Sequence, residues 1–264
     1  MKHITSRDNP IYRGLLQLAA SPRDRRASGR MLLDGLHLLA AYRDAYGMEQ
    51  MQVIARSSVT ERPDIARWLR VGTQSIVLAD GLFDALSPVE TPGGILAAVP
   101  IPRGPATEPP AEGFLVLLDG IQDPGNLGSI LRSAAAAGGT EAYLSGQCAD
   151  PWSPKCLRGG MGAQFALHIE DRADLPATAA AFQGVLLVLE PSASASLFDL
   201  DLSAGKMAFI LGSEGGGIDP RLRALAQRPV RIPMHPGVES LNVGAAAAVC
   251  FFEWARQRKL RAAN

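Results

Sequence analysis

Short apolar runs bounded by turn residues recur along the chain and predict buried β-strands. They cover residues 51–55, 75–79, 114–118, 185–189 and 207–211. Helix-like stretches separate these runs, at 10–20, 31–44, 62–71, 128–138, 219–227 and 241–260. Strands that alternate with helices in this way are typical of an α/β protein with parallel sheets.

The segment 101–113 differs in composition from both of its flanks, because it contains four prolines and shows no apolar periodicity. Such a segment is typical of a linker. We therefore expect a small α/β domain at residues 1–100, a linker at 101–112 and a larger domain at 113–264.

Composition narrows the class of protein. The 264 residues are 47% apolar and 20% charged, which excludes disordered, collagen-like and coiled-coil chains. Basic and acidic residues number 26 each, so any surface that binds nucleic acid has to be local. The polar start lacks a secretory apolar run, and no stretch reaches the roughly 18 apolar residues of a membrane span. We expect a soluble cytoplasmic protein that does not bind membranes.

The cysteines and the basic clusters carry little chemistry by themselves. The three cysteines, Cys148, Cys156 and Cys250, form no Cys-x-x-Cys pair and have no spacing suited to zinc. We therefore expect reduced thiols and no metal ion. Residues 1–30 carry seven basic side chains against two acidic ones, and 256–261 add four more. A solvated helix face explains such clusters better than RNA binding does, as long as no other observation is considered.

Three glycine-rich segments follow predicted strands, where ligands of α/β proteins bind. In the first, 117–139, a strand ends at Asp119, a Pro-Gly turn follows, and a helix begins near residues 126–128. Arg132 lies one turn after Gly128, so we expect its guanidinium to reach back over bare backbone and to form a pocket with one cation. The alternative makes Gly128 a packing glycine and Arg132 a surface charge. The segment lacks a full Gly-x-Gly-x-x-Gly fingerprint, which argues against a dinucleotide site.

The second and third segments lie toward the end of the chain. In 209–220, four glycines surround Glu214 directly after a strand, so backbone amides can approach a ligand closely. A flexible turn is the plain alternative. In 230–259, a short strand and a Pro/Gly turn precede a long helix whose residues 244–248 have almost no side chains. That face suits close packing against a ligand or against another helix.

In this order the three segments resemble the three motifs of the SpoU, or TrmH-like, RNA ribose 2′-O-methyltransferases of the SPOUT superfamily. The first motif is matched at Asp119, Pro124, Asn126, Gly128, Ile130 and Arg132. The second is matched at Leu211, Gly212, Glu214 and Gly217, and the third at 232–234, 240–243 and Glu253.

The likeness extends beyond the motifs. Residues 6–39 resemble the N-terminal substrate-binding domain of many of these enzymes, a ribosomal-protein-like α/β unit that binds RNA. Residues 153–167 resemble the segment that follows the first motif, with Lys155 and Arg158 in their usual places. The chain departs from the family pattern at Gly160, Gly244, Pro236 and Asp34, where members usually have Ser, Ser, Gly and Glu.

The resemblance implies a fold and a cofactor. The fold is a C-terminal SPOUT domain with a parallel sheet and a deep trefoil knot, preceded by the small RNA-binding domain. The cofactor is S-adenosyl-L-methionine, held in the knotted loops. Its expected contacts are Glu190, Pro191, Leu211, Gly212, Glu214, Ile232, Met234, Ser240 and Leu241.

The resemblance also implies a reaction in which a ribose 2′-oxygen attacks the methyl group of the sulfonium in line. No metal ion is required. We expect Arg132 to stabilise the developing alkoxide or to fix a phosphate, because a guanidinium is a poor general base. Asn126 and Asn242 would orient the ribose, and Glu214 would fix Arg132 or accept a proton.

The expected partners are RNA and a second copy of the chain. The expected substrate is large-subunit ribosomal RNA, and transfer RNA is the alternative substrate. A non-catalytic RNA-binding role in ribosome assembly is the alternative function. The Ala-rich helix 241–257 is the expected dimer contact. The expected RNA contacts are Arg7, Arg13, Arg23, Arg25, Arg26, Lys155 and Arg158.

Overall fold

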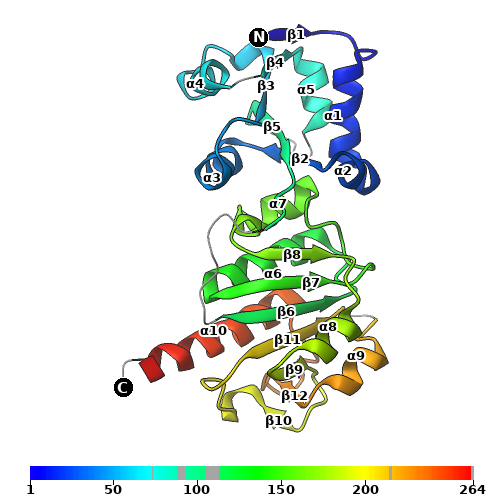
Figure 1. The fold of residues 1–264 in the computed structure, drawn as a ribbon, viewed down its shortest axis with the longest axis vertical. Coiled ribbons are helices and arrows are strands. Elements are labelled where there is room, and N and C mark those ends of the chain that lie inside the picture. Colours follow the sequence, from blue (N-terminus) through cyan, green and yellow to red (C-terminus); the bar gives the residue numbers. More distant parts are fainter. Residues whose placement is uncertain (73, 88–92, 105–112, 214–215, 263–264) are drawn as a thin grey trace.

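Two β-sheets with their helices lie one above the other in the computed structural model (Figure 1). The structure describes the chain except for residues 73, 88–92, 105–112, 214–215 and 263–264. The strands of the first sheet come from residues 2–100 and those of the second from residues 114–231.

The first sheet has the order β1-β4-β3-β5-β2 among the described residues. Its strands are β1 (Lys2–Ile4), β2 (Arg30–Asp34), β3 (Gln52–Arg56), β4 (Gln74–Leu78) and β5 (Ile95–Pro100). Its helices are α1 (Pro10–Ala20), α2 (Pro22–Ser28), α3 (Leu36–Tyr46), α4 (Pro63–Val71) and α5 (Asp80–Leu86). Strand β5 runs antiparallel to β2 and β3, so this sheet is mixed and not purely parallel as predicted.

One predicted helix, 31–44, is partly wrong. Met31, Leu32 and Leu33 are fully buried on both faces of β2, and the chain turns at Gly35, whose φ is +91°. The helix starts only at Leu36. A continuous apolar run suits a strand that is covered on both sides, and the single-sequence pattern does not separate it from a helix.

The second sheet is parallel throughout its described strands and has the order β10-β12-β9-β11-β6-β7-β8. These are β6 (Phe114–Asp119), β7 (Gly139–Leu144), β8 (His168–Asp171), β9 (Val185–Leu189), β10 (Ala195–Ser196), β11 (Met207–Gly212) and β12 (Arg228–Arg231). The helices are α6 (Pro124–Ala137), α7 (Pro154–Gly160), α8 (Leu175–Ala181), α9 (Pro220–Leu225) and α10 (Val243–Ala262). The predicted strands 114–118, 185–189 and 207–211 are confirmed.

Alternating side chains of β6 and β11 divide the second unit into layers. Phe114 and Phe209 face α6 and α10, where they stack with Phe251 and Trp254. The intervening side chains face α8 and α9. The sheet is therefore covered on both faces, as is usual for parallel sheets.

Helix α6 begins earlier than predicted and packs tightly. Asp123 caps it by accepting a hydrogen bond from the Asn126 amide, with Pro124 in the first turn. A Cβ at Gly128 would lie 2.5 Å from the Cys156 carbonyl oxygen of α7, so Gly128 allows the two helices to touch. The packing alternative for Gly128 holds, and the expected pocket over its bare backbone is wrong, because α7 occupies that space.

Helix α7 also joins the two units (Figure 1). Trp152, Leu157 and Phe165 pack into the apolar cluster of the first unit, where Phe165 meets Tyr42 edge to face. Beside this contact, Arg25 Nε donates to Asp150 Oδ2 at 2.6 Å, and both side chains are almost completely buried.

Candidate active site

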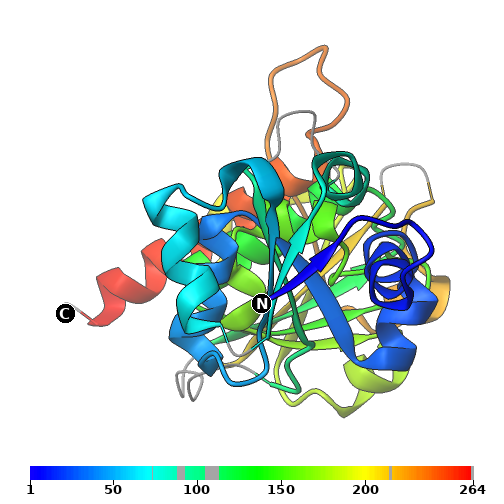
Figure 2. The same cartoon turned by 90° about the horizontal axis from the view of Figure 1, so that it is seen from above.

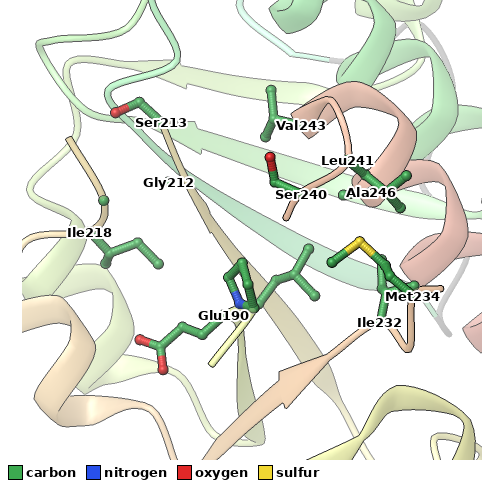
Figure 3. A pocket seen from close by; sticks show the side chains of 13 residues that line it. Glu190, Gly212, Ser213, Ile218, Ile232, Met234, Ser240, Leu241, Val243 and Ala246 are labelled. Atoms are coloured by element: carbon green, nitrogen blue, oxygen red, sulfur yellow. The ribbon is translucent and has the colours of Figure 1, made fainter. Parts of the chain in front are cut away.

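A cavity of about 280 Å³ lies at the carboxyl ends of β9, β11 and β12 (Figure 3). It is bounded by the loops after these strands and by the start of α10. Seven of the expected cofactor contacts line it: Glu190, Pro191, Gly212, Ile232, Met234, Ser240 and Leu241. The neighbouring strand order of β12, β9 and β11 brings these loops together, although they lie far apart along the chain.

Most of the cavity wall is apolar. Met234 and Ile232 lie side by side beneath Leu241, and Ile218 lies on the opposite side (Figure 3). This arrangement suits a flat aromatic ring between aliphatic side chains. Leu211 is not part of the wall, because its side chain is buried in the core against α6 and α10; only its backbone is available to a ligand.

Glu190 contributes a carboxylate at the rim of the cavity. Arg223 of α9 holds it through two hydrogen bonds, one of them from Nη2 to Oε2 at 2.9 Å. Arg223 did not stand out in the sequence, because its partner lies 33 residues away. A carboxylate fixed in this way is a suitable acceptor for ligand hydroxyl groups.

Glycines shape the loop after β11. A Cβ on Gly212 would lie 2.3 Å from the Gly217 carbonyl oxygen, so Gly217 packs directly on the bare backbone of Gly212. The Ser213 hydroxyl accepts a hydrogen bond from the Gly216 amide, and Gly217 has a φ of +68°. Asp119 at the end of β6 fixes the far side of the loop by accepting from the Asp219 amide at 2.8 Å. Glu214 lies outside the described residues.

The starts of α6 and α10 meet beside this cavity. Asn242 caps α10, since its Oδ1 accepts from the Gly244 amide at 3.0 Å, and its Nδ2 donates to Asn126 Oδ1 at 3.0 Å. The structure thus brings together two residues that are 116 positions apart in the sequence. Val243, next to Asn242, lines the cavity.

A second cavity, of about 480 Å³ and mostly polar, adjoins the first. Ser213 and Val243 contribute to both cavities. Asn126 lines the polar cavity, together with Gln122 and Gln147 from the loops after β6 and β7. Sequence reasoning missed both glutamines, although their positions directly after strands were a usable signal.

Arg132 is not among the residues that line the two cavities. It is on the exposed face of α6. Within the part of the chain that the structure describes, its guanidinium has no hydrogen-bond or ion-pair partner. It is therefore available to a phosphate or to another bound group.

The predicted RNA contacts divide into exposed and engaged side chains. Arg7 and Arg23 are exposed, and Arg13 is exposed beside Asp8. Lys155 binds Asp123 at 2.9 Å, and this hydrogen bond lowers the pKa of the Asp123 carboxyl.

Arg25 has to be removed from that set. Its side chain is 2% exposed and is held by Asp150, so RNA has no access to it. Arg26 is 3.6 Å from Asp171, and Arg158 is 3.8 Å from the buried Asp34, at the junction of the two units. Arg26 and Arg158 retain partial exposure.

The fold and the site together define a class of protein. A doubly covered parallel sheet with ligand cavities at the carboxyl ends of its strands is typical of an α/β enzyme that binds a small molecule. Across the described residues there is no group of three or more potential metal ligands. In the same residues, no helix has the length and apolar character needed to cross a membrane.

The chain belongs to the SpoU rRNA Methylase family, whose family model matches residues 113–252. It is 33% identical to an uncharacterized tRNA/rRNA methyltransferase of Synechocystis sp., over 97% of this chain and 94% of the relative. It is 28% identical to the 23S rRNA (guanosine(2553)-2'-O)-methyltransferase RlmP of Bacillus subtilis, over 96% of this chain and 98% of the relative.

Solved structures agree with this assignment. The SpoU methyltransferase AviRb from Streptomyces viridochromogenes, in complex with AdoMet, superimposes with a TM-score of 0.84 at 26% identity, over 95% of this chain and 98% of AviRb. An AdoMet-bound rRNA methyltransferase from Sinorhizobium meliloti gives a TM-score of 0.80 at 25% identity, over 97% of each chain. Both alignments include the first unit as well as the second.

Proposed function

We propose that this protein transfers a methyl group from S-adenosyl-L-methionine to a ribose 2′-hydroxyl of large-subunit ribosomal RNA. One observation carries the proposal: residues of the second and third motifs converge on one apolar cavity, directly beside the Asn126–Asn242 pair. The names of RlmP and AviRb, which describe a 23S rRNA 2′-O-methyltransferase and an AdoMet complex, support both the reaction and the donor.

The described cavity suits the donor. Its adenine would lie between Ile232, Met234 and Leu241, and the Glu190 carboxylate would accept from the donor's ribose hydroxyls. When bound, the donor supplies a methyl group on a positively charged sulfur.

The residues at the boundary of the two cavities would handle the acceptor. Asn126 and Asn242 fix one another and would orient the ribose for in-line attack, in which the new carbon–oxygen bond forms as the carbon–sulfur bond breaks. Arg132 would stabilise the developing negative charge or hold the adjacent phosphate. Glu214 stays a candidate to fix Arg132 or to accept the proton.

The same proposal includes the organisation of the molecule. Residues 1–100 would form the RNA-binding domain, 101–112 the linker and 113–264 the catalytic domain with its trefoil knot.

We also propose that the protein works as a homodimer in the cytoplasm. The half-exposed Phe252 on α10 and the half-exposed Val238 on the segment before it offer apolar side chains to a second copy. Figure 2 shows that segment, in orange, projecting beyond the sheets.

Two measurements on the purified full chain test the proposal. Isothermal titration with S-adenosylmethionine should show saturable binding of one donor per subunit. Radiolabelled donor should then methylate ribosomal RNA, and not transfer RNA, from a strain that lacks the gene, and mapping of 2′-O-methyl groups should find one position. Asn126→Ala serves as the matched control, which should bind the donor and transfer nothing. Absence of donor binding by the wild type would refute the proposal.

A further inference from the structure

We infer that the polar cavity beside the donor site receives the base of the target nucleotide and that Gln147 reads its edge. The inference rests on the proposed function and adds a specificity-determining residue to it. Three observations carry it: the position of the cavity, the unengaged amide of Gln147, and the absence of a cationic side chain from the described wall.

The position follows from the chemistry of a nucleotide. The base is attached to the ribose carbon next to the one that carries the 2′-hydroxyl, so a hydroxyl placed at the methyl group brings its base close by. The polar cavity shares Ser213 and Val243 with the donor cavity and contains Asn126. Its volume of about 480 Å³ falls within the range of small-molecule sites, about 300–1,000 Å³.

Gln147 presents its amide over the floor of this cavity. A Cβ built on Gly120 would lie 3.8 Å from Gln147 Oε1 and 3.6 Å from Ser213 Oγ, so both side chains approach the same point above Gly120. Gln147 and Gln122 have no hydrogen-bond partner among the residues that the structure covers. A glutamine amide offers one acceptor and two donors, which is the pattern that pairs with the edge of a base.

The loop that carries Gln147 is held in place. The Gly120 amide donates to Ser145 Oγ at 3.0 Å, and the Ala149 amide donates to the Ile121 carbonyl oxygen at 2.8 Å. These bonds join the loops after β6 and β7 on both sides of Gln147. These bonds fix the backbone that carries Gln147, so binding of a base has to order only the glutamine side chain.

The charge of the described wall favours a base over a phosphate. Asp123 is the charged side chain among the described wall residues, and Lys155 pairs with it from outside the cavity. A phosphate would face a carboxylate there and would find no cationic side chain in the described wall. A neutral, unstacked base matches the uncharged amides better, and single-stranded RNA is recognised through such splayed bases.

Methyl-transfer assays on the full chain with Gln147→Ala test the inference. The substrate is ribosomal RNA from a strain that lacks the gene, and the 2′-O-methylnucleosides are separated and quantified after digestion. Loss of a base contact that consists of two hydrogen bonds should lower kcat/KM by about 10- to 100-fold. Methylation should also spread to more than one of the four nucleosides, a change that a purely structural role does not produce.

Matched variants separate the possible outcomes. Gln122→Ala should give the same kind of loss, and Gln183→Ala, an exposed glutamine after α8 at the amino-terminal edge of the sheet, should leave rate and product unchanged. The thermal midpoint and the donor affinity of Gln147→Ala should equal those of the wild type. An affinity for S-adenosylmethionine that falls in step with the rate would place the donor's amino-acid end in this cavity and overturn the inference.

A further result separates this inference from the proposed function. If the wild type methylates RNA and Gln147→Ala gives the same rate and the same product, only the role of Gln147 in base recognition is refuted, and the proposed function stands. A wild type that methylates no RNA refutes both.

Discussion

At the scale of single residues, burial decides which charges can act on a ligand. Arg132 and Arg25 are both arginines on helices, but Arg132 is exposed without a described partner, whereas Arg25 is buried against Asp150. The exposed guanidinium can bind a substrate, because no anion among the described residues pairs with it. The buried guanidinium of Arg25 is paired with Asp150 inside the protein, so a ligand cannot reach it.

Arg132→Ala should abolish most methyl transfer while the donor still binds. Loss of one preorganised donor to a developing oxyanion typically lowers kcat by about 10²–10³-fold. Arg132 lines neither cavity, so the donor affinity measured by titration should not change. Lys206→Ala, a change at the opposite edge of the sheet before β11, is the control with full activity. A fully active Arg132→Ala variant would remove Arg132 from the mechanism.

Asp34 should make folding stability depend on pH. Burial raises the pKa of its carboxyl above the ordinary 3.8, against the hydrogen bond from Ser87 and the charge of Arg158. The folded state therefore holds this proton more tightly than the unfolded chain does. The resulting stabilisation is complete below pH 3.8 and is lost as the pH rises through the raised pKa.

Comparison with Asp34→Asn isolates this contribution. Urea unfolding at a series of pH values should show the wild type losing stability relative to the variant as the pH rises from below 3.8 to neutrality. Parallel curves for the two proteins would mean that Asp34 titrates normally in the folded state.

At the scale of elements, close backbone contact fixes how α6 is placed. Gly128 touches α7, and Gly244 at the start of α10 lies near Ser129 of α6. Both contacts hold the first turn of α6, and with it Asn126, next to the cap of α10. The small residues of these helices thus serve helix packing, which in turn positions the site.

Gly128→Ala should destabilise the protein, because its Cβ would meet backbone atoms of α7 that cannot move aside alone. Overpacking of this kind costs about 1–3 kcal/mol in the free energy of unfolding. Gly14→Ala in α1 is the matched control, since its Cβ would meet nothing within 4 Å. That change should stabilise the helix by about 0.5–1 kcal/mol. Chemical denaturation of both variants measures the difference, and equal stabilities would contradict the packing argument.

At the scale of the whole molecule, the two units are joined by a buried interface. Its apolar part centres on Phe165, Tyr42 and Trp152, and its polar part is the Arg25–Asp150 pair. Such an interface keeps the exposed basic residues of the first unit in a constant position relative to the cavities. We expect the RNA-binding surface and the site to act as one body.

Arg25→Ala and Arg23→Ala should separate structural from RNA-binding roles. Removal of one partner from a buried ion pair costs about 3–5 kcal/mol, so Arg25→Ala should unfold at a lower urea concentration. Arg23 is exposed, so Arg23→Ala should keep its stability and should bind RNA more weakly, with a smaller salt dependence. Filter binding at several salt concentrations measures the second effect. An Arg25→Ala variant of unchanged stability would contradict the structural role.

Prediction from the sequence succeeded where local signals are strong. The strands 114–118, 185–189 and 207–211 were predictable, because each is a short apolar run that ends at a glycine or an acidic residue. Strands β7 and β8 were missed because they are half-buried and carry polar side chains such as Glu141 and Glu170. Strand β2 was taken for a helix because a fully buried run has no periodicity to read.

The sequence by itself determined the chemistry of the three loops, since a strand, a glycine turn and a helix start are local patterns that neighbouring residues specify. Only the tertiary structure decided which of these side chains meet. Residues of the loops after β9, β11 and β12 share one cavity because the strand order places those strands side by side. The same long-range packing buried Arg25, turned Gly128 toward α7 and left Gln147 open beside the donor site.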